Sequence, residues 1–127
     1  MAVDVEKRRP VLANVQGGLS GPAIKPIALL KTWQVYQEAA PHKVPIIGQG
    51  GITTASDALE FLIAGASAVG VGTALFYDPL VCQKINAGIA DYLRRHGFRN
   101  VGELVGTLAT GSSSAVQQTV SAAGTAG

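Results

Sequence analysis

Two short glycine motifs, spaced along the chain and each following an apolar run, most constrain what this chain can fold into. The first is Gly48-Gln49-Gly50-Gly51 and the second is Gly72-Thr73, 22 residues further on when counted from Gly50 to Gly72. That spacing leaves room for one helix between two parallel strands. Because parallel strands end at the same edge of a sheet, the two glycine turns are expected to lie side by side and to offer backbone N–H groups to one phosphate.

The apolar run before each glycine motif is typical of a buried parallel strand. Residues 44–47 are continuously apolar, without the alternation that one solvated face would produce, so a strand buried on both faces is predicted there. Residues 66–71 predict a second strand of the same kind. With 47% hydrophobic residues, the chain is apolar enough to form a core and too apolar to be disordered throughout.

Helix signals separate and flank these strands. Ile27, Leu30, Trp33 and Tyr36 recur every three residues and predict one apolar helix face over 27–39, ended by Pro41. Thr54 and Asp57 form a near capping box that opens a helix ending at Gly65. After the second strand, Asp78 is predicted to be an N-cap before Pro79, and the helix that follows is predicted to stop near Gly97. A last short helix is predicted from Asn100 to about Leu108. At the start of the chain, the sequence predicts an extended segment over 10–15 and a glycine-rich loop over 17–21.

The order strand, helix, strand, helix predicts a right-handed parallel α/β arrangement. A dinucleotide-binding sheet would place its glycines on one loop, whereas here they occupy two successive loops, which favours the last βα units of a TIM (β/α)8 barrel. A closed barrel needs roughly 250 residues, so 127 residues predict an incomplete barrel. We assign residues 1–108 to this barrel portion and residues 109–127, biased toward Ser, Ala, Gly and Thr, to a low-complexity mobile tail.

Composition excludes several other classes of function. A net charge of +2 with one short basic cluster argues against nucleic-acid binding. The single cysteine, Cys82, provides no disulfide framework and no metal-binding thiolate cluster, and its setting in an apolar stretch predicts a small buried thiol. No run of 18 apolar residues and no export signal is seen, so a cytoplasmic protein without a membrane span is expected.

The glycine turns are the candidate binding site, and no catalytic or metal-ligating group is assigned. Gly50 and Gly51 have no side chains to hold a phosphate away, and Gly72-Thr73 can add backbone N–H groups. The alternative is that these glycines only form tight turns at strand ends. Lys25 could approach the same anion or could only solvate the first turn of its helix. Nothing in the sequence combines a nucleophile, a base and an orienting group.

Several blocks of the sequence resemble the C-terminal half of dihydroorotate dehydrogenases of the class 1B type. The most specific is Gly17-Gly18-Leu19-Ser20-Gly21-Pro22-Ala23-Ile24-Lys25-Pro26. The blocks over 4–14, 45–52, 64–74 and 78–82 continue the resemblance in register, which covers about residues 1–108.

The resemblance implies an FMN-dependent barrel that oxidises dihydroorotate to orotate in de novo pyrimidine biosynthesis. It also implies a homodimer working with an electron-transfer subunit that carries FAD and an iron–sulfur cluster. The family's FMN contacts in this region carry over onto Gly21, Gly50, Gly51, Gly72 and Thr73.

The same resemblance places other functional groups before the position that matches Met1. These are the family's catalytic cysteine, its flavin-contacting lysine and the asparagines that bind the pyrimidine, so this chain alone is expected to be inactive. Cys82 lies at a different position and does not replace that base. Two alternatives stay open: a non-catalytic half-barrel that binds a phosphorylated ligand or self-associates, and a related phosphate-binding barrel similar to inosine monophosphate dehydrogenase.

Overall fold

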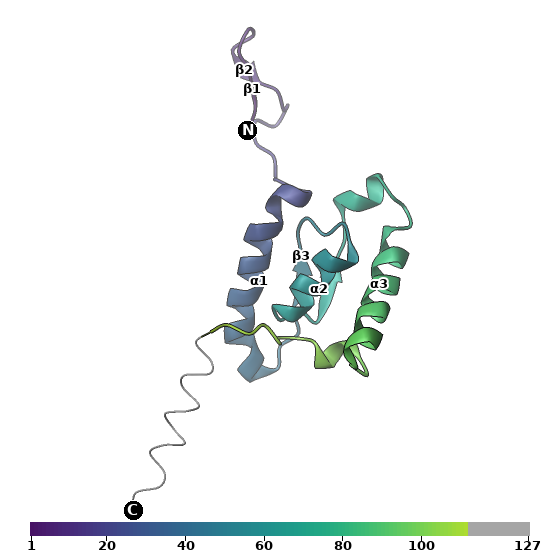
Figure 1. The fold of residues 1–127 in the computed structure, drawn as a ribbon. Helices are drawn as coiled ribbons and strands as arrows, with labels where there is room; N and C mark the ends of the chain where they lie inside the picture. The colour runs from purple at the N-terminus through teal and green to yellow at the C-terminus, as the bar shows by residue number, and fades with distance from the viewer. Residues whose placement is uncertain (112–127) are drawn as a thin grey trace, which may run out of the picture.

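The computed structural model describes residues 1–111, so most of the predicted tail over 109–127 lies outside the described residues. The elements are β1 (Val3–Asp4), β2 (Arg9–Pro10), η1 (Pro22–Ile24), α1 (Lys25–Ala39), η2 (Ala40–His42), β3 (Ile47–Gln49), α2 (Ala55–Ile63), β4 (Ala68–Gly70), η3 (Thr73–Phe76), α3 (Val81–His96) and η4 (Val101–Glu103). The antiparallel pair β1–β2, which the sequence analysis missed, forms a small hairpin standing away from the other elements (Figure 1). No helix within residues 1–111 is long and apolar enough to cross a membrane.

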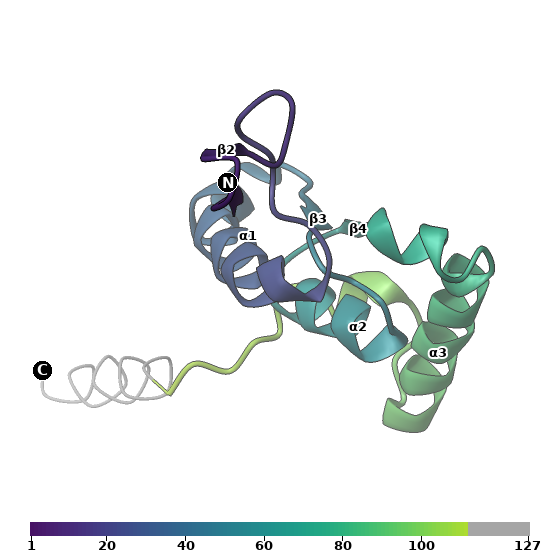
Figure 2. The same ribbon diagram turned by 90° about the horizontal axis from the view of Figure 1, so that it is seen from above.

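The predicted parallel βαβ unit is present. β3 pairs with β4 in parallel, with Gly48 opposite Val69 at the centre of the register, and α2 connects the two strands. Seen from above, the two strands lie side by side between α1 and α3 (Figure 2). Both strands are shorter than predicted: β3 begins only at Ile47, after Pro45, which has no N–H group for a strand ladder. Residues 1–111 contain no closed barrel.

The capping box is formed as predicted and fixes the start of α2. The Thr54 hydroxyl accepts a hydrogen bond from the Asp57 amide at 3.2 Å, and the Asp57 carboxylate accepts one from the Thr54 amide at 2.9 Å. From this start α2 runs through four buried residues and ends at Ile63, just before Gly65. The helix is therefore held close behind the first glycine turn, which it follows directly in the chain.

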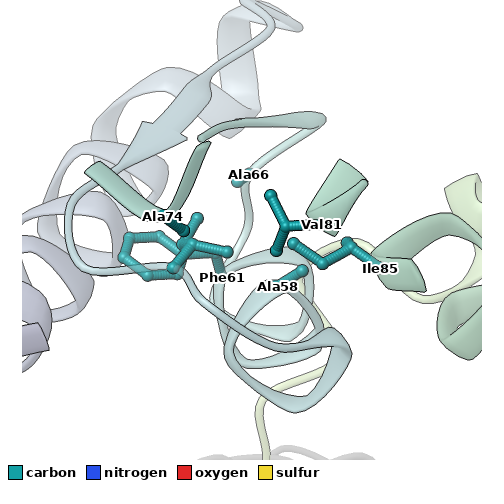
Figure 3. Close-up of a cluster of buried hydrophobic side chains, with 7 residues drawn as sticks. Ala58, Phe61, Ala66, Ala74, Val81 and Ile85 are labelled. Carbon is teal, nitrogen blue, oxygen red and sulfur yellow. The ribbon is translucent and has the colours of Figure 1, made fainter. Parts of the chain in front are cut away.

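The core lies on the two sides of α2. One cluster joins Ile52 and the residues shown in Figure 3, namely Ala58, Phe61, Ala66, Ala74, Val81 and Ile85. The second joins Leu59, Leu62 and Leu104, with the C-terminal half of α3 packed against it. Phe61 is fully buried and is the largest side chain of the first cluster. Packing against both ends of α3 fixes α2 and hence the turns at its start.

Several local predictions are corrected by the structure. Val44 and Ile47 are 56% and 65% exposed, so the first strand is not buried on both faces. β3 and β4 pair only with each other within residues 1–111, so the outer edge of each strand has no strand partner there. The Cys82 thiol is exposed rather than buried, because α3 turns Val81 and Ile85 toward the core instead.

Other corrections concern helices. α1 begins at Lys25, two residues early, and buries Thr32 while Ile27 and Leu30 are about half exposed. α3 begins at Val81 rather than beside Asp78, whose carboxylate accepts a hydrogen bond from the Leu80 amide. The predicted helix from Asn100 to Leu108 is only the single turn η4; beyond it, Gly106 and Leu108 donate backbone hydrogen bonds to the end of α2.

Candidate functional site

Three segments far apart in the sequence meet in one cavity of about 320 Å³ at the carboxyl ends of β3 and β4. The first precedes α1, the second is the β3–α2 turn and the third is the turn after β4. The cavity is lined by Leu19, Ser20, Gly21, Ile24, Gln49, Gly50, Gly51, Ile52, Thr53, Gly70, Gly72, Thr73 and Ala74. All five predicted site residues, Gly21, Gly50, Gly51, Gly72 and Thr73, are therefore brought together, and Lys25 is not among the lining residues.

The Gly50–Gly51 turn requires glycine mainly because the turn packs closely against the start of α1. Gly50 and Gly51 have φ angles of 128° and 71°, in the region that favours glycine. A Cβ atom at Gly50 would stand 2.6 Å from the Ala28 Cβ, and one at Gly51 would stand 2.7 Å from the Gly21 carbonyl oxygen. Both glycines thus allow the turn to pack on the segment around η1, a packing constraint in addition to the ligand approach and tight-turn roles that the sequence predicts.

The second turn has a different geometry. Gly72 has a negative φ of −119°, outside the left-handed region, and a Cβ atom there would meet nothing within 4 Å. Gly72 is therefore not required by packing. A small residue at this position leaves the cavity open, which is the property expected where backbone must approach a ligand.

Backbone N–H groups at both turns are available as donors. Within residues 1–111, the amides of Gly51, Gly72 and Thr73 donate to no backbone carbonyl. Ladder bonding between β3 and β4 does not consume them, since the paired residues end at Gln49 and Gly70. Amides that converge on one concave surface are suited to an anion with several oxygens, such as a phosphate.

No charged side chain lines the cavity within the described residues. Lys25, which sequence reasoning left open as an anion ligand, instead extends to α2, with its Nζ 2.6 Å from Asp57 Oδ1 and 2.9 Å from Glu60 Oε1. The hydrogen bonds to Asp57 and then Glu60 raise the pKa of Lys25 against the opposing effect of burial. Any phosphate in the cavity would thus be held by backbone and hydroxyl groups rather than by this ammonium.

Asp57 is the most perturbed acid near the cavity. Burial opposes its ionisation, but the hydrogen bonds from Lys25, Thr53 and Thr54 outweigh that effect and hold the pKa of the Asp57 carboxyl well below its ordinary value. Asp57 is consequently a fixed anion at neutral pH, engaged on both oxygens, and is not available as a general base.

Sequence reasoning missed three polar residues that line the cavity, Ser20, Gln49 and Thr53. Each lies within two residues of a predicted glycine, so flanking position was the only signal that could have identified them. The Thr53 hydroxyl already donates to Asp57 at 2.9 Å.

Parallel strands joined by a helix, with a cavity at their carboxyl ends, are typical of an α/β protein of the TIM-barrel type. Comparison with known families makes this specific. The model of the family described as dihydroorotate dehydrogenase matches residues 1–93. This chain therefore belongs to the dihydroorotate dehydrogenase family.

Individual relatives agree. The chain is 62% identical over 108 residues to the catalytic subunit of dihydroorotate dehydrogenase B (NAD(+)) from Geotalea daltonii, covering 85% of this chain and 34% of that protein. It is 58% identical over 108 residues to the protein of the same name from Porphyromonas gingivalis, with the same coverage. The chain thus spans about one third of the length of the curated relatives it matches.

Solved structures also match. The ligand-free DHODH of Eimeria tenella superposes with a TM-score of 0.68 at 33% identity, over 80% of this chain and 28% of that chain. The same enzyme in complex with ferulenol gives a TM-score of 0.67 at 32% identity, over 80% and 27%. The family implies a TIM-barrel-type enzyme, of which residues 1–111 present a part.

Proposed function

We propose that this chain supplies the FMN phosphate site of a class 1B dihydroorotate dehydrogenase, as part of the C-terminal half of its barrel. The observation that carries this proposal is the convergence of Gly21, Gly50, Gly51, Gly72 and Thr73 on one cavity of about 320 Å³. The whole enzyme would oxidise dihydroorotate to orotate in de novo pyrimidine biosynthesis, in keeping with the names of the relatives.

The residues present fit the phosphate end of FMN. The free amides of Gly51, Gly72 and Thr73 can donate to phosphate oxygens, and the Gly72 side of the cavity has room for them to approach. Bound FMN would supply the electron-accepting flavin ring in the complete enzyme. This chain's own contribution would be to anchor and orient the cofactor through its phosphate.

The proposed assembly follows from the same family membership. The curated relatives are named as catalytic subunits, which supports a separate electron-transfer subunit. That subunit is proposed to carry FAD and an iron–sulfur cluster and to work with a homodimer of catalytic subunits in the cytoplasm. We expect the 127-residue chain by itself to show no dihydroorotate oxidation, because it contains no counterpart of the family's catalytic cysteine.

A direct test compares three ligands against the ¹⁵N-labelled chain by amide NMR. FMN and inorganic phosphate are expected to shift the Gly51, Gly72 and Thr73 resonances, whereas riboflavin, which lacks the phosphate, is expected to shift them much less and only at higher concentration. Weak binding is sufficient for this measurement. Equal shifts with riboflavin and FMN, or shifts confined to other residues, would refute the phosphate site.

A substitution in the open turn sharpens the test. Gly72→Asp places a carboxylate where the structure has free space, so folding should be retained while FMN is repelled. Gly111→Asp is the matched control, because a Cβ atom at Gly111 also meets nothing within 4 Å and Gly111 does not line the cavity. Unchanged FMN-induced shifts in the Gly72→Asp chain would count against the proposal.

The second candidate, a non-catalytic half-barrel that self-associates, is favoured by one observation. Ile47 in β3 is 65% exposed, and within residues 1–111 neither outer edge of the two-stranded β3–β4 sheet is paired with another strand. Exposed apolar surface and unpaired strand edges promote association. Sedimentation velocity tests this candidate: a monomer at all concentrations would exclude it, whereas a dimer is compatible with both candidates, which the FMN titration then separates.

A further inference from the structure

A cluster of three ionisable side chains joins α1 to α2 directly behind the cavity. Lys25, the first residue of α1, binds Asp57 at 2.6 Å and Glu60 at 2.9 Å. The Lys25 and Asp57 side chains are only 24% and 13% exposed, and Glu60 is 40% exposed. Ordering a lysine in partly buried surroundings costs free energy through desolvation and loss of side-chain entropy. The Lys25 ammonium does not line the cavity, so its charge has no direct role in the proposed phosphate site.

The second oxygen of Asp57 holds the chain that leaves the first glycine turn. Asp57 Oδ2 accepts hydrogen bonds from the amide and hydroxyl of Thr53 at 3.0 and 2.9 Å. It accepts two more from the amide and hydroxyl of Thr54, both at 2.9 Å. Since Thr53 lines the cavity, one carboxylate connects Lys25 to the segment that follows Gly51.

The backbone of Lys25 reaches the same turn from the other side. A Cβ atom at Gly51 would stand 3.1 Å from the Lys25 amide nitrogen and 2.9 Å from the Lys25 Cβ. The turn therefore lies against Lys25 through its glycine and is bonded to Asp57 through its threonines. The turn is packed between the start of α1 and the start of α2. The ion pair of 2.6 Å between Lys25 and Asp57 joins these two helix starts directly.

We propose that Lys25 and Asp57 are positioning residues, which fix the amides of the Gly50–Gly51 turn in the arrangement that favours a phosphate. The inference rests on the function proposed above and adds to it a determinant that does not touch the ligand. Donors held in place before binding discriminate more sharply than mobile ones, because less ordering is needed when the ligand arrives. Glu60 contacts Lys25 but no residue of the turn, and so has no such role.

The test measures the preference of the 127-residue chain for FMN over riboflavin, from amide-shift titrations. Lys25→Met removes the ammonium while keeping a long side chain, and Asp57→Asn keeps an acceptor oxygen for Thr53 and Thr54 while losing the ion pair. In both variants the preference should fall by about five- to ten-fold, whereas Lys25→Arg and Glu60→Gln should stay within about two-fold of the original chain. If Lys25 and Asp57 only stabilised the fold, the substitutions would weaken the binding of FMN and of riboflavin equally, and the preference for FMN would be unchanged.

A second readout needs no ligand. In the free Lys25→Met chain the Gly50 and Gly51 amide resonances should move or broaden, while those of the Glu60→Gln chain stay in place. If Lys25→Met does not fold, Asp57→Asn carries the same comparison. An original chain without preference for FMN overturns the proposed function together with this inference. A preference that persists in Lys25→Met and Asp57→Asn overturns the positioning role alone.

Discussion

The two glycine turns of the cavity impose different demands at single residues. Gly51 combines a φ of 71° with close contact to the Gly21 carbonyl and to Lys25. Gly72 has an ordinary φ and open space beside it. A left-handed φ and close packing therefore require glycine in the first turn, whereas neither requires it in the second, although both turns look alike in the sequence.

Alanine substitutions should separate these demands. Gly51→Ala is expected to lower the free energy of unfolding by about 1–3 kcal/mol, because the added methyl group combines backbone strain with a steric clash. Gly72→Ala should change it by no more than about 0.5 kcal/mol. Urea denaturation followed by circular dichroism measures both, and equal losses at the two positions would contradict the geometry described for them.

Asp57 should make stability sensitive to acid. Its pKa is lowered in the folded chain, so as the pH falls the unfolded chain takes up this proton first, near the ordinary carboxyl pKa of 3.8. The stabilisation from ionised Asp57 is thus fully present above that pH and is lost progressively below it.

Asp57→Asn should therefore weaken the chain at neutral pH by about 1–3 kcal/mol and should flatten the decline of stability below pH 4. Part of the decline should remain, because the pKa values of Asp78 and Asp91 are also lowered, by bonds to Lys84 and to Arg95. Urea midpoints measured from pH 7 to pH 3 give the comparison, and parallel curves for the two chains would show that Asp57 does not carry the effect.

At the scale of elements, α2 is the central support of the fold. It separates the two core clusters and begins directly behind the first glycine turn. Phe61, on α2, fills the space beside Gly48, where a Cβ atom would stand only 2.7 Å from the phenylalanine ring. β3, which leads into the Gly50–Gly51 turn, therefore packs closely against the Phe61 ring.

Phe61→Ala should lower the free energy of unfolding by about 3–5 kcal/mol through loss of buried area and formation of a cavity. Phe76→Ala is the matched control: Phe76 is 90% exposed, and its removal should cost no more than about 0.5 kcal/mol. Thermal and urea denaturation of both variants provide the measurement. A small effect at Phe61 would mean that α2 does not hold β3 in place.

What could be predicted from the sequence at this scale is what neighbouring residues encode. The capping box at Thr54 and Asp57 and the order of strand and helix depend on short-range signals, and both are present. The buried side of α1 could not be predicted, because apolar residues lie on both sides of that helix and only the packing partner selects Thr32 over Ile27 and Leu30. The meeting of Gly50 and Gly51 with Gly72 and Thr73 followed from parallel topology, whereas Gly21 was identified only through the family resemblance. The Lys25–Asp57 bond, between residues 32 apart, left no local signal.

For the whole molecule, the incomplete β3–β4 sheet is the dominant feature. Ile47, the first residue of β3, is 65% exposed although its residue type predicts burial, and Val44, which precedes the strand, is exposed beside α1. Within residues 1–111 no further strand pairs with β3 or β4, so the outer edges of both strands are also left unpaired by strands. The apolar character of residues 44–47 is thus adapted to a larger contact than these residues make by themselves.

Ile47→Lys should reduce self-association of the chain without weakening its fold, because the side chain is already 65% exposed. Ile27→Lys, at a residue on α1 that is 56% exposed, is the control and should leave association unchanged. Sedimentation velocity at several concentrations measures the difference. Identical behaviour of the two variants would show that the open sheet face is not the surface through which copies meet.

The open sheet also determines how thermal stability of this chain has to be understood. When two copies cover each other's exposed strands, the folded state gains free energy that unfolded chains do not share. The melting temperature then rises as the sample is concentrated, so that a single value has meaning only when the concentration is stated with it.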